Sequence, residues 1–190
     1  MADPGNENSR FQPWLRGSRY AYSKCLAQTI VLSEVRNSAF PAVVVAPTFM
    51  IGPRDARPSS GKLFLYGLRN RVVFYPPGGK NFVDAEHVAE AICHALTKGR
   101  TGSTYLLSGR NMTYRHFFAR VRRLSGRAQL HIAIPRWLLV LSGYACEGLT
   151  ALTGFYLPLN RVNQQLLCLD NYFSNSKAKA ELNLRPTNIT

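Results

Sequence analysis

Tyr20 and Lys24 are the two residues of this sequence whose types and spacing are best suited to chemistry. They read Tyr-x-x-x-Lys at the head of a segment rich in helix-forming residues, and this spacing places the phenol and the ammonium one turn apart on one helix face. A cation close to a phenol stabilises the phenolate. A phenol paired in this way can give or take a proton at a carbonyl or alcohol carbon. The alternative is a chance pairing of Tyr20 and Lys24 on a solvent-exposed face.

The segments around this pair predict the elements that position it. A helix is expected from about Ser18, a suitable N-cap residue, to Val35. Residues 41–46 form an apolar run rich in β-branched residues, which is typical of a buried parallel strand. An irregular loop is expected over residues 47–55, at the carboxyl end of that strand, where open α/β sheets bind ligands.

The rest of the chain alternates between strand and helix patterns. Strands are expected over residues 72–75 and 104–108, a turn over 76–80, and helices over 62–69, 85–98, 113–125, 160–170 and 176–182, with another beginning at 134. This alternation predicts an α/β fold with a parallel sheet. Because only about three strands are visible, we expect the sheet to need further strands upstream.

The chain is strongly basic, with 24 Lys and Arg against 10 Asp and Glu, a net charge of +14 and a pI near 10.2. Such an excess suits an anionic partner: nucleic acid, an anionic membrane surface or an anionic cofactor. In the densest stretch, residues 110–127, the arginines alternate with apolar residues, as on a helix with one exposed and one buried face. We therefore favour a solvated helix there, and nucleic acid is not the expected partner.

The four cysteines lie far apart without metal-ligand spacing, which predicts reduced thiols, no metal site and a cytoplasmic protein. The first ten residues lack the apolar core of a secretion signal. The most apolar region, residues 134–159, is interrupted by Arg136, Glu147 and several glycines, so no membrane span is expected. Residues 137–144 are nevertheless suited to lying on a membrane surface.

Five motifs, in order along the chain, resemble a known family. They are Tyr20-x-x-x-Lys24, the apolar run 43–46 continuing into 47–53, Asn81-Phe82-Val83 followed by Val88-Ala89, residues 102–114, and Lys177-Ala178 with Glu181-Leu182. Together they resemble the second half of an extended short-chain dehydrogenase/reductase of the NAD(P)-dependent epimerase/dehydratase group. Within it, the dihydroflavonol 4-reductase-like and hydroxysteroid-dehydrogenase-like members are the most similar.

The resemblance implies a role for each matching residue. Tyr20 would be the catalytic acid/base, and Lys24 would hydrogen-bond the ribose of the nicotinamide cofactor. The residues running past the nicotinamide would be Pro47, Thr48, Phe49 and Met50. The cofactor would be NAD or NADP, and the substrate a small molecule with a carbonyl or alcohol carbon, bordered by residues 52–61 and by the helical region after 134. The helix carrying Tyr20 and Lys24 would also form a two-fold homodimer contact.

The sequence also departs from the family pattern. The Gly-x-x-Gly-x-x-Gly turn that holds the cofactor pyrophosphate is absent from all 190 residues, and so is the residue that selects NAD or NADP. The catalytic Ser or Thr of the family cannot be assigned, because Ser9 and Ser18 follow no strand. The expected fold is thus the C-terminal part of a Rossmann-like doubly wound parallel sheet: a loop over residues 1–17, the half sheet over 18–130, and a truncated, mostly helical substrate-binding region over 131–190.

Three functions follow from these observations. The first is a fragment of an NAD(P)-dependent oxidoreductase or epimerase that transfers hydride, with Tyr20 moving the proton, and with little or no activity as an isolated chain because the cofactor is poorly positioned. The second is a non-catalytic truncated module that binds a partner through an exposed sheet edge. The third is a basic binder of nucleic acid or a membrane surface, whose binding would weaken with added salt.

Overall fold

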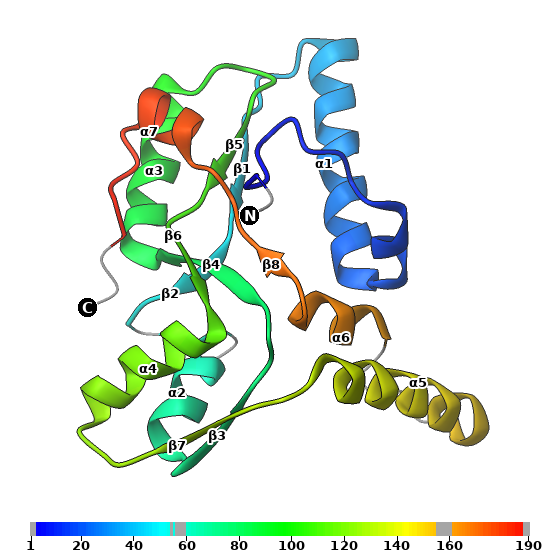
Figure 1. Cartoon of the computed structure of the whole chain (residues 1–190). Coiled ribbons are helices and arrows are strands. Elements are labelled where there is room, and N and C mark those ends of the chain that lie inside the picture. The colour runs from blue at the N-terminus through cyan, green and yellow to red at the C-terminus, as the bar shows by residue number, and fades with distance from the viewer. Residues whose placement is uncertain (1–2, 54, 56–59, 155–160, 188–190) are drawn as a thin grey trace. The chain divides into compact units, whose positions relative to one another are not determined.

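The computed structural model describes residues 3–53, 55, 60–154 and 161–187, and the chain divides into two compact units (Figure 1). Unit 1 consists of Met1–Arg57, Asn81–Asn111 and Tyr172–Thr190. Unit 2 consists of Pro58–Lys80 and Met112–Asn171. Each unit is therefore assembled from segments that are distant in the sequence.

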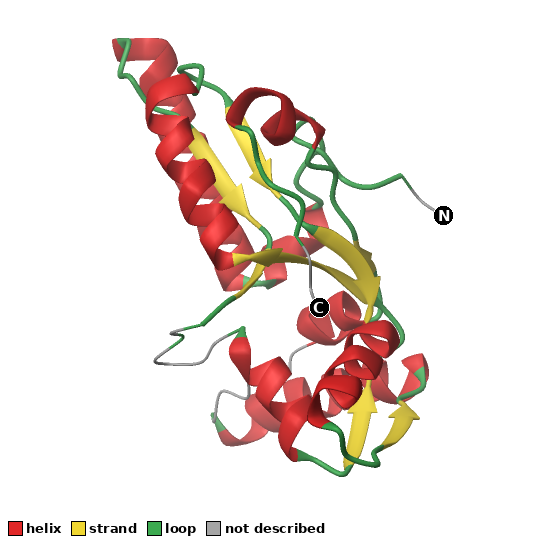
Figure 2. Cartoon of the chain, turned by 90° about the vertical axis from the view of Figure 1, so that its left-hand side faces the viewer, coloured by secondary structure: helices red, strands yellow, loops and turns green. Residues whose placement is uncertain are grey.

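The strands of unit 1 pair in parallel. β1 (Val44–Pro47) pairs with β5 (Thr104–Leu107), and this register places Pro47 opposite Leu107. Figure 2 shows the two strands side by side with their arrows pointing the same way. β2 (Phe49–Ile51) pairs in parallel with the last three residues of β4 (Gly79–Asp84). β6 (Arg110–Thr113) neighbours β4 in the strand order.

Helices flank the β1–β5 pair on both sides. α3 (Ala85–Lys98) and α7 (Ser176–Leu182) lie on one side and α1 (Arg19–Ser38) on the other (Figure 1). A short 3-10 helix, η1 (Pro13–Gly17), precedes α1. The N-caps of α1 and α3 are local in origin, because in each of these two helices a side chain accepts one of the first free backbone N–H groups. The Ser18 hydroxyl accepts from the Ala21 N–H, and the Asp84 carboxylate accepts from the Glu86 N–H at 2.8 Å.

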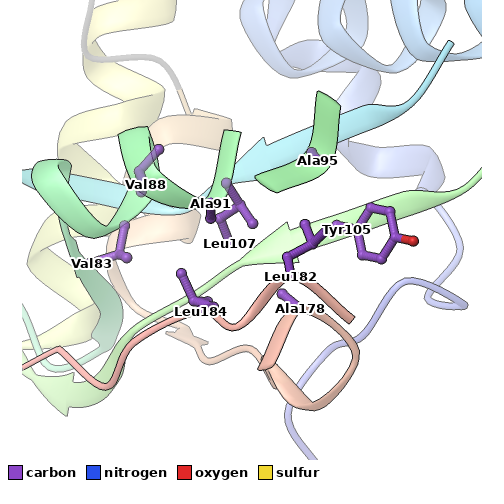
Figure 3. Packing of buried hydrophobic residues seen from close by; sticks show 9 residues of the cluster. All are labelled: Val83, Val88, Ala91, Ala95, Tyr105, Leu107, Ala178, Leu182 and Leu184. Carbon is purple, nitrogen blue, oxygen red and sulfur yellow. The ribbon is translucent and has the colours of Figure 1, made fainter. Parts of the chain in front are cut away.

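The core of unit 1 lies between α3, α7 and the strands (Figure 3). Its buried members are Val83, Val88, Ala91, Ala95, Tyr105, Leu107, Ala178, Leu182 and Leu184. α1 differs from the other long helices, because none of its 20 residues is buried and Ile30 is 62% exposed. Among the described residues, β1 also has β5 as its only strand partner. One edge of β1 and much of α1 are therefore uncovered.

Unit 2 is built around two parallel strands and pairs of packed helices. β3 (Val72–Tyr75) pairs with β7 (Leu130–Ala133), and α2 (Gly61–Arg69) packs against α4 (Tyr114–Ser125). Gly67 permits this close approach, since a Cβ there would lie 2.8 Å from the Phe118 ring. α5 (Arg136–Thr153) packs on α6 (Arg161–Leu167), and β8 (Asp170–Asn171) pairs with the first residues of β4.

The helix predicted over the arginine-rich stretch is confirmed as α4. Phe117, Phe118 and Val121 are buried, while Arg115, Arg122 and Arg123 are exposed to solvent. The Thr113 hydroxyl caps the helix by accepting from the His116 N–H. The arginines therefore occupy the solvated face of an amphipathic helix.

The predicted α/β fold with parallel pairing is confirmed, but the strand count was too low. Eight strands occur in the described part of the chain, against about three predicted. The segment 47–55, expected to be an irregular loop, contains β2, and the turn expected at 76–80 runs into β4. The helix expected over 160–170 ends at Leu167 and is followed by β8. These strands are two to six residues long and polar or interrupted, so hydrophobic periodicity does not reveal them.

Over the residues with described positions, no helix is long and apolar enough to cross a membrane. In the same residues, His, Cys, Asp and Glu form no group of three or more that is placed to hold a metal ion.

Candidate active site

Tyr20 and Lys24 both lie on the first turns of α1 and point to solvent. The Tyr20 side chain is 74% exposed, and the Lys24 Nζ lies 5.8 Å from the centre of the Tyr20 ring. The Ser18 cap fixes where the helix begins, and the Ser23 hydroxyl donates to the Tyr20 carbonyl at 2.9 Å. The predicted one-turn juxtaposition of phenol and ammonium is therefore present, and both groups are open to a ligand.

The position of this pair along the sheet follows from two contacts of α1. The Gln28 Nε2 donates to the Thr104 hydroxyl at 3.2 Å, and a Cβ on Gly102 would lie 3.2 Å from Val35. α1 thus runs opposite to β5, with its N-terminal end toward the carboxyl end of the strand. Going back from Gln28 to Tyr20 covers about 12 Å of helix, which equals between three and four strand residues at about 3.3 Å each. Tyr20 is therefore level with the carboxyl ends of β1 and β5.

Residues 47–50 lie at that same end. Pro47 ends β1 and is exposed, and the Thr48 N–H continues the pairing by donating to the Leu107 carbonyl at 3.2 Å. The Phe49 ring packs edge-on against Phe82 at 5.5 Å between ring centres, while Met50 is 40% exposed. Of these four candidate residues, Pro47 and Met50 are thus open to a ligand, Thr48 is held by the strands, and Phe49 packs inward.

A buried amide network holds Thr48 in place. The Thr48 hydroxyl donates to Asn81 Oδ1 at 2.7 Å, and the Gly109 N–H donates to the same oxygen at 2.7 Å. Asn81 Nδ2 donates to Asn111 Oδ1 at 2.6 Å, and Asn111 in turn exchanges two hydrogen bonds with the backbone of Phe173. Asn81 is only 2% exposed, so its amide satisfies polar groups that would otherwise be buried unpaired.

Sequence reasoning did not identify this network. Its members are some 30 residues apart, and asparagine between apolar residues gives no local indication of its partners. The Asn81-Phe82-Val83 motif pointed to the segment without assigning the asparagine a task. Thr48, a candidate site residue found from the sequence, is therefore held by a hydrogen-bond network that only the tertiary structure reveals.

The serines upstream of Tyr20 have structural roles. The Ser18 hydroxyl caps α1, and the Ser9 hydroxyl accepts from the Asn6 N–H at 2.9 Å. The surroundings of the α1 N-terminus are positive, because Arg16, Arg19 and Lys24 are exposed there and no acidic residue occupies the first turn. The helix N-terminus adds its own partial positive charge. This end of unit 1 therefore suits an anionic ligand.

Parallel strands flanked by helices on both sides, with polar groups at the strands' carboxyl ends, define a Rossmann-like nucleotide-binding fold. The sequence profile of the NAD dependent epimerase/dehydratase family matches residues 1–108. The chain belongs to this family, as the sequence motifs predicted.

Individual relatives agree with this assignment. Sterol demethylase protein B from Methylococcus capsulatus is 29% identical over 132 residues, which make up 68% of this chain and 40% of that protein. The crystal structure of gox2253 matches 97% of this chain with a TM-score of 0.81 and 27% identity. The dTDP-glucose 4,6-dehydratase of Bacillus anthracis, solved in complex with NAD, matches 98% of this chain with a TM-score of 0.67 and 16% identity. The last likeness concerns the fold alone.

The chain is much shorter than these proteins. It spans 40% of the length of the curated relative, 56% of gox2253 and 51% of the dehydratase. The residues present fit the nicotinamide end of a dinucleotide, since the exposed Tyr20 and Lys24 side chains lie level with the carboxyl ends of β1 and β5. The glycine-rich turn for the pyrophosphate is not among the 190 residues.

Proposed function

We propose that this chain carries the proton-transfer part of an NAD(P)-dependent oxidoreductase or epimerase that acts at a carbonyl or alcohol carbon. The observation that supports it best is the exposed Tyr20–Lys24 pair level with the carboxyl ends of β1 and β5. Tyr20 would donate a proton to the substrate oxygen during reduction and accept it during oxidation. Lys24 would hold the ribose hydroxyls and stabilise the phenolate.

A bound nicotinamide would supply or accept the hydride. Pro47, Thr48 and Met50 would border its ring, with the Thr48 backbone fixed by its bond to Leu107 and its side chain by Asn81. In this arrangement the reacting carbon would lie between the Tyr20 hydroxyl and the carboxyl ends of the strands.

The names of the relatives suggest two kinds of substrate. One relative is named for sterol demethylation and another for a nucleotide sugar. Both names are compatible with a ring alcohol or ketone as the reacting group, so we propose that class and no narrower one.

Cofactor binding tests the proposal directly. The chain is titrated with NADH and NADPH by calorimetry, and the titration is repeated with Lys24→Met and with Lys98→Met, a matched change of an exposed lysine on α3. Binding that falls about tenfold or more in Lys24→Met alone supports the proposed site. Equal effects of the two substitutions would contradict it.

Measurements of turnover distinguish the proposed role of Tyr20 from that of the nearby Tyr22. In any form of the protein that reduces substrate, Tyr20→Phe should lower kcat by about 100-fold or more while leaving cofactor affinity within a few-fold. Tyr22→Phe is the matched control, since Tyr22 is on the same helix with its ring 6.4 Å from that of Phe11. Because the pyrophosphate turn is absent from these residues, we expect the chain by itself to turn over little or no substrate, and measurable NAD(P)H turnover by the chain alone would contradict that expectation.

A non-catalytic role in assembly is the second candidate. It is favoured by the unpaired edge of β1 and by α1, which buries no residue. An unpaired strand edge binds further strands, and an exposed apolar helix face forms dimers. Light scattering at rising concentration should reveal association that Ile30→Arg weakens, whereas a monomer at every concentration would argue against it.

A further inference from the structure

The exposed side of α5 in unit 2 carries a continuous apolar surface. We call it the α5 apolar face, and it consists of Trp137, Leu138, Leu141, Tyr144, Leu149 and Leu152. Trp137 is 66% exposed and Leu152 is 87% exposed, so the face extends over the whole length of the helix. Isolated exposed apolar residues are ordinary on protein surfaces, but a contiguous set with an aromatic residue marks a surface of contact.

The two charged residues of α5 lie beside this face and not within it. Arg136 and Glu147 are eleven residues apart, which is about three turns, so they share one side of the helix. The Glu147 carboxylate accepts from the Arg161 N–H at 3.0 Å, and that side therefore faces α6. Gly143 is buried there as well, since a Cβ would lie 2.9 Å from the Arg161 backbone. The α5 apolar face thus contains no charge.

The N-terminal part of the face is hollowed and edged by cations. Arg136, Trp137, Val140, Leu141 and Tyr144 line an open hollow of about 730 Å³. The Arg161 guanidinium lies 5.4 Å from the centre of the Tyr144 ring and donates to the Tyr144 hydroxyl at 3.4 Å. An aromatic residue with an apolar body and a polar tip beside an arginine is the arrangement found at membrane–water interfaces.

The charge of unit 2 is complementary to an anionic surface. Its segments, residues 58–80 and 112–171, contain eleven Lys and Arg but only two acidic residues, Glu147 and Asp170. Most of the net charge of +14 therefore belongs to the unit that carries the α5 apolar face. Basic residues near an anionic bilayer each strengthen binding, and the effect is screened by salt.

We propose that the α5 apolar face lies against the surface of an anionic lipid bilayer, with Trp137 and Leu141 at the level of the headgroups and acyl boundary and with Arg136 and Arg161 on anionic headgroups. The helix would lie in the plane of the interface and not cross it. This proposal is independent of the catalytic one, because it uses no residue of the Tyr20 site.

The first experiment measures where Trp137 lies. The protein has two tryptophans, so Trp14→Phe leaves Trp137 as the single indole without altering the face. With vesicles of phosphatidylcholine containing phosphatidylserine, we expect a blue shift of Trp137 emission and quenching by lipids brominated on the acyl chain. Binding should weaken with added salt and be much weaker on phosphatidylcholine alone. Unchanged emission and no quenching would overturn the proposal.

A matched pair of substitutions tests which surface binds. Leu152→Ser and Leu96→Ser replace leucines that are 87% and 83% exposed on α5 and α3, respectively. In vesicle flotation, Leu152→Ser and Leu141→Ser should each reduce the partition coefficient several-fold to about tenfold, and Leu96→Ser should not. Arg136→Gln should reduce it about fivefold on anionic vesicles only. Equal losses in all three leucine variants, or a dimer of lipid-free protein that Leu141→Ser dissociates while vesicle binding is unchanged, would overturn it.

Discussion

Replacing Asn81 by alanine tests the buried network that holds Thr48. The substitution removes the acceptor of the Gly109 N–H and the Thr48 hydroxyl, and the donor to Asn111, all at 2.6–2.7 Å. The three losses are not equal. The Thr48 hydroxyl can turn to the Leu107 carbonyl, now 3.5 Å away, and the exposed Asn111 can bind water. Among the residues that the structure describes, the Gly109 N–H has no other acceptor.

The expected cost follows from this difference. A buried polar group left without a partner costs about 1–3 kcal/mol, and the lost amide of a residue that is 2% exposed adds a cavity. We therefore expect Asn81→Ala to lower the free energy of unfolding by about 2–4 kcal/mol. Urea unfolding followed by circular dichroism measures it. Asn37→Ala is the control, because Asn37 is exposed on α1 and should change stability by no more than about 0.5 kcal/mol.

A double-mutant cycle with Thr48→Val tests the network itself. The two side chains share a hydrogen bond, so their effects should be coupled by about 0.5 kcal/mol or more. Additive effects, or a loss below about 1 kcal/mol for Asn81→Ala alone, would refute the argument. Because Asn81 holds Thr48, the same variant should also weaken NADH binding if the proposed cofactor site is correct.

Three further predictions concern single contacts. Gly109→Ala should destabilise unit 1 by about 2 kcal/mol or more in urea unfolding, since its Cβ would lie 2.2 Å from the Phe82 carbonyl oxygen. The control is Gly148→Ala on an open helix surface, which should stabilise the protein by up to about 1 kcal/mol. A variant of Gly109 more stable than the variant of Gly148 would contradict this packing. Tyr114→Phe should raise the melting temperature, because the buried Tyr114 hydroxyl finds no hydrogen-bond partner among the described residues, whereas Tyr105→Phe should lower it by losing a 2.6 Å bond to Glu181. Hydrogen bonds from Tyr105 and Arg100 lower the pKa of Glu181 below its ordinary value of 4.5, so its ionised form stabilises the fold above that pH and the contribution is lost as pH falls through the lower folded value. Melting curves of Glu181→Gln should therefore diverge from those of the unsubstituted chain near neutral pH and converge with them in acid, and a constant difference at every pH would count against this pairing.

The sequence alone predicts those elements whose structure is determined by residues within one short segment. The Ser18 and Thr113 caps, the apolar run that forms β1 and the amphipathic pattern of α4 each lie within one segment, and each element was predicted. The one-turn pairing of Tyr20 and Lys24 also follows from spacing alone.

The elements that were not predicted from the sequence are those stabilised by residues distant in the chain. β4 was not predicted because Gly79, Lys80 and Asn81 lack the alternation of a strand, and its polar Asn81 is buried only by virtue of Thr48, Gly109 and Asn111. β7 has exposed Leu130 and Ile132, and its pairing with β3 joins segments more than fifty residues apart. No local sequence pattern indicates which distant segment such a strand pairs with.

The division into two units has a consequence for how this protein can be modified. The chain passes from one unit to the other four times, at residues 57/58, 80/81, 111/112 and 171/172. Neither unit can be excised as one continuous gene segment, and a single peptide cleavage between residues 58 and 171 leaves both fragments with pieces of both units. A unit 2 taken from a relative would have to be grafted as two inserts, residues 58–80 together with 112–171. Recombination at junction 80/81 or 111/112 would instead break β4 or β6, so this architecture resists the simple exchange of modules by which many multidomain proteins diversify.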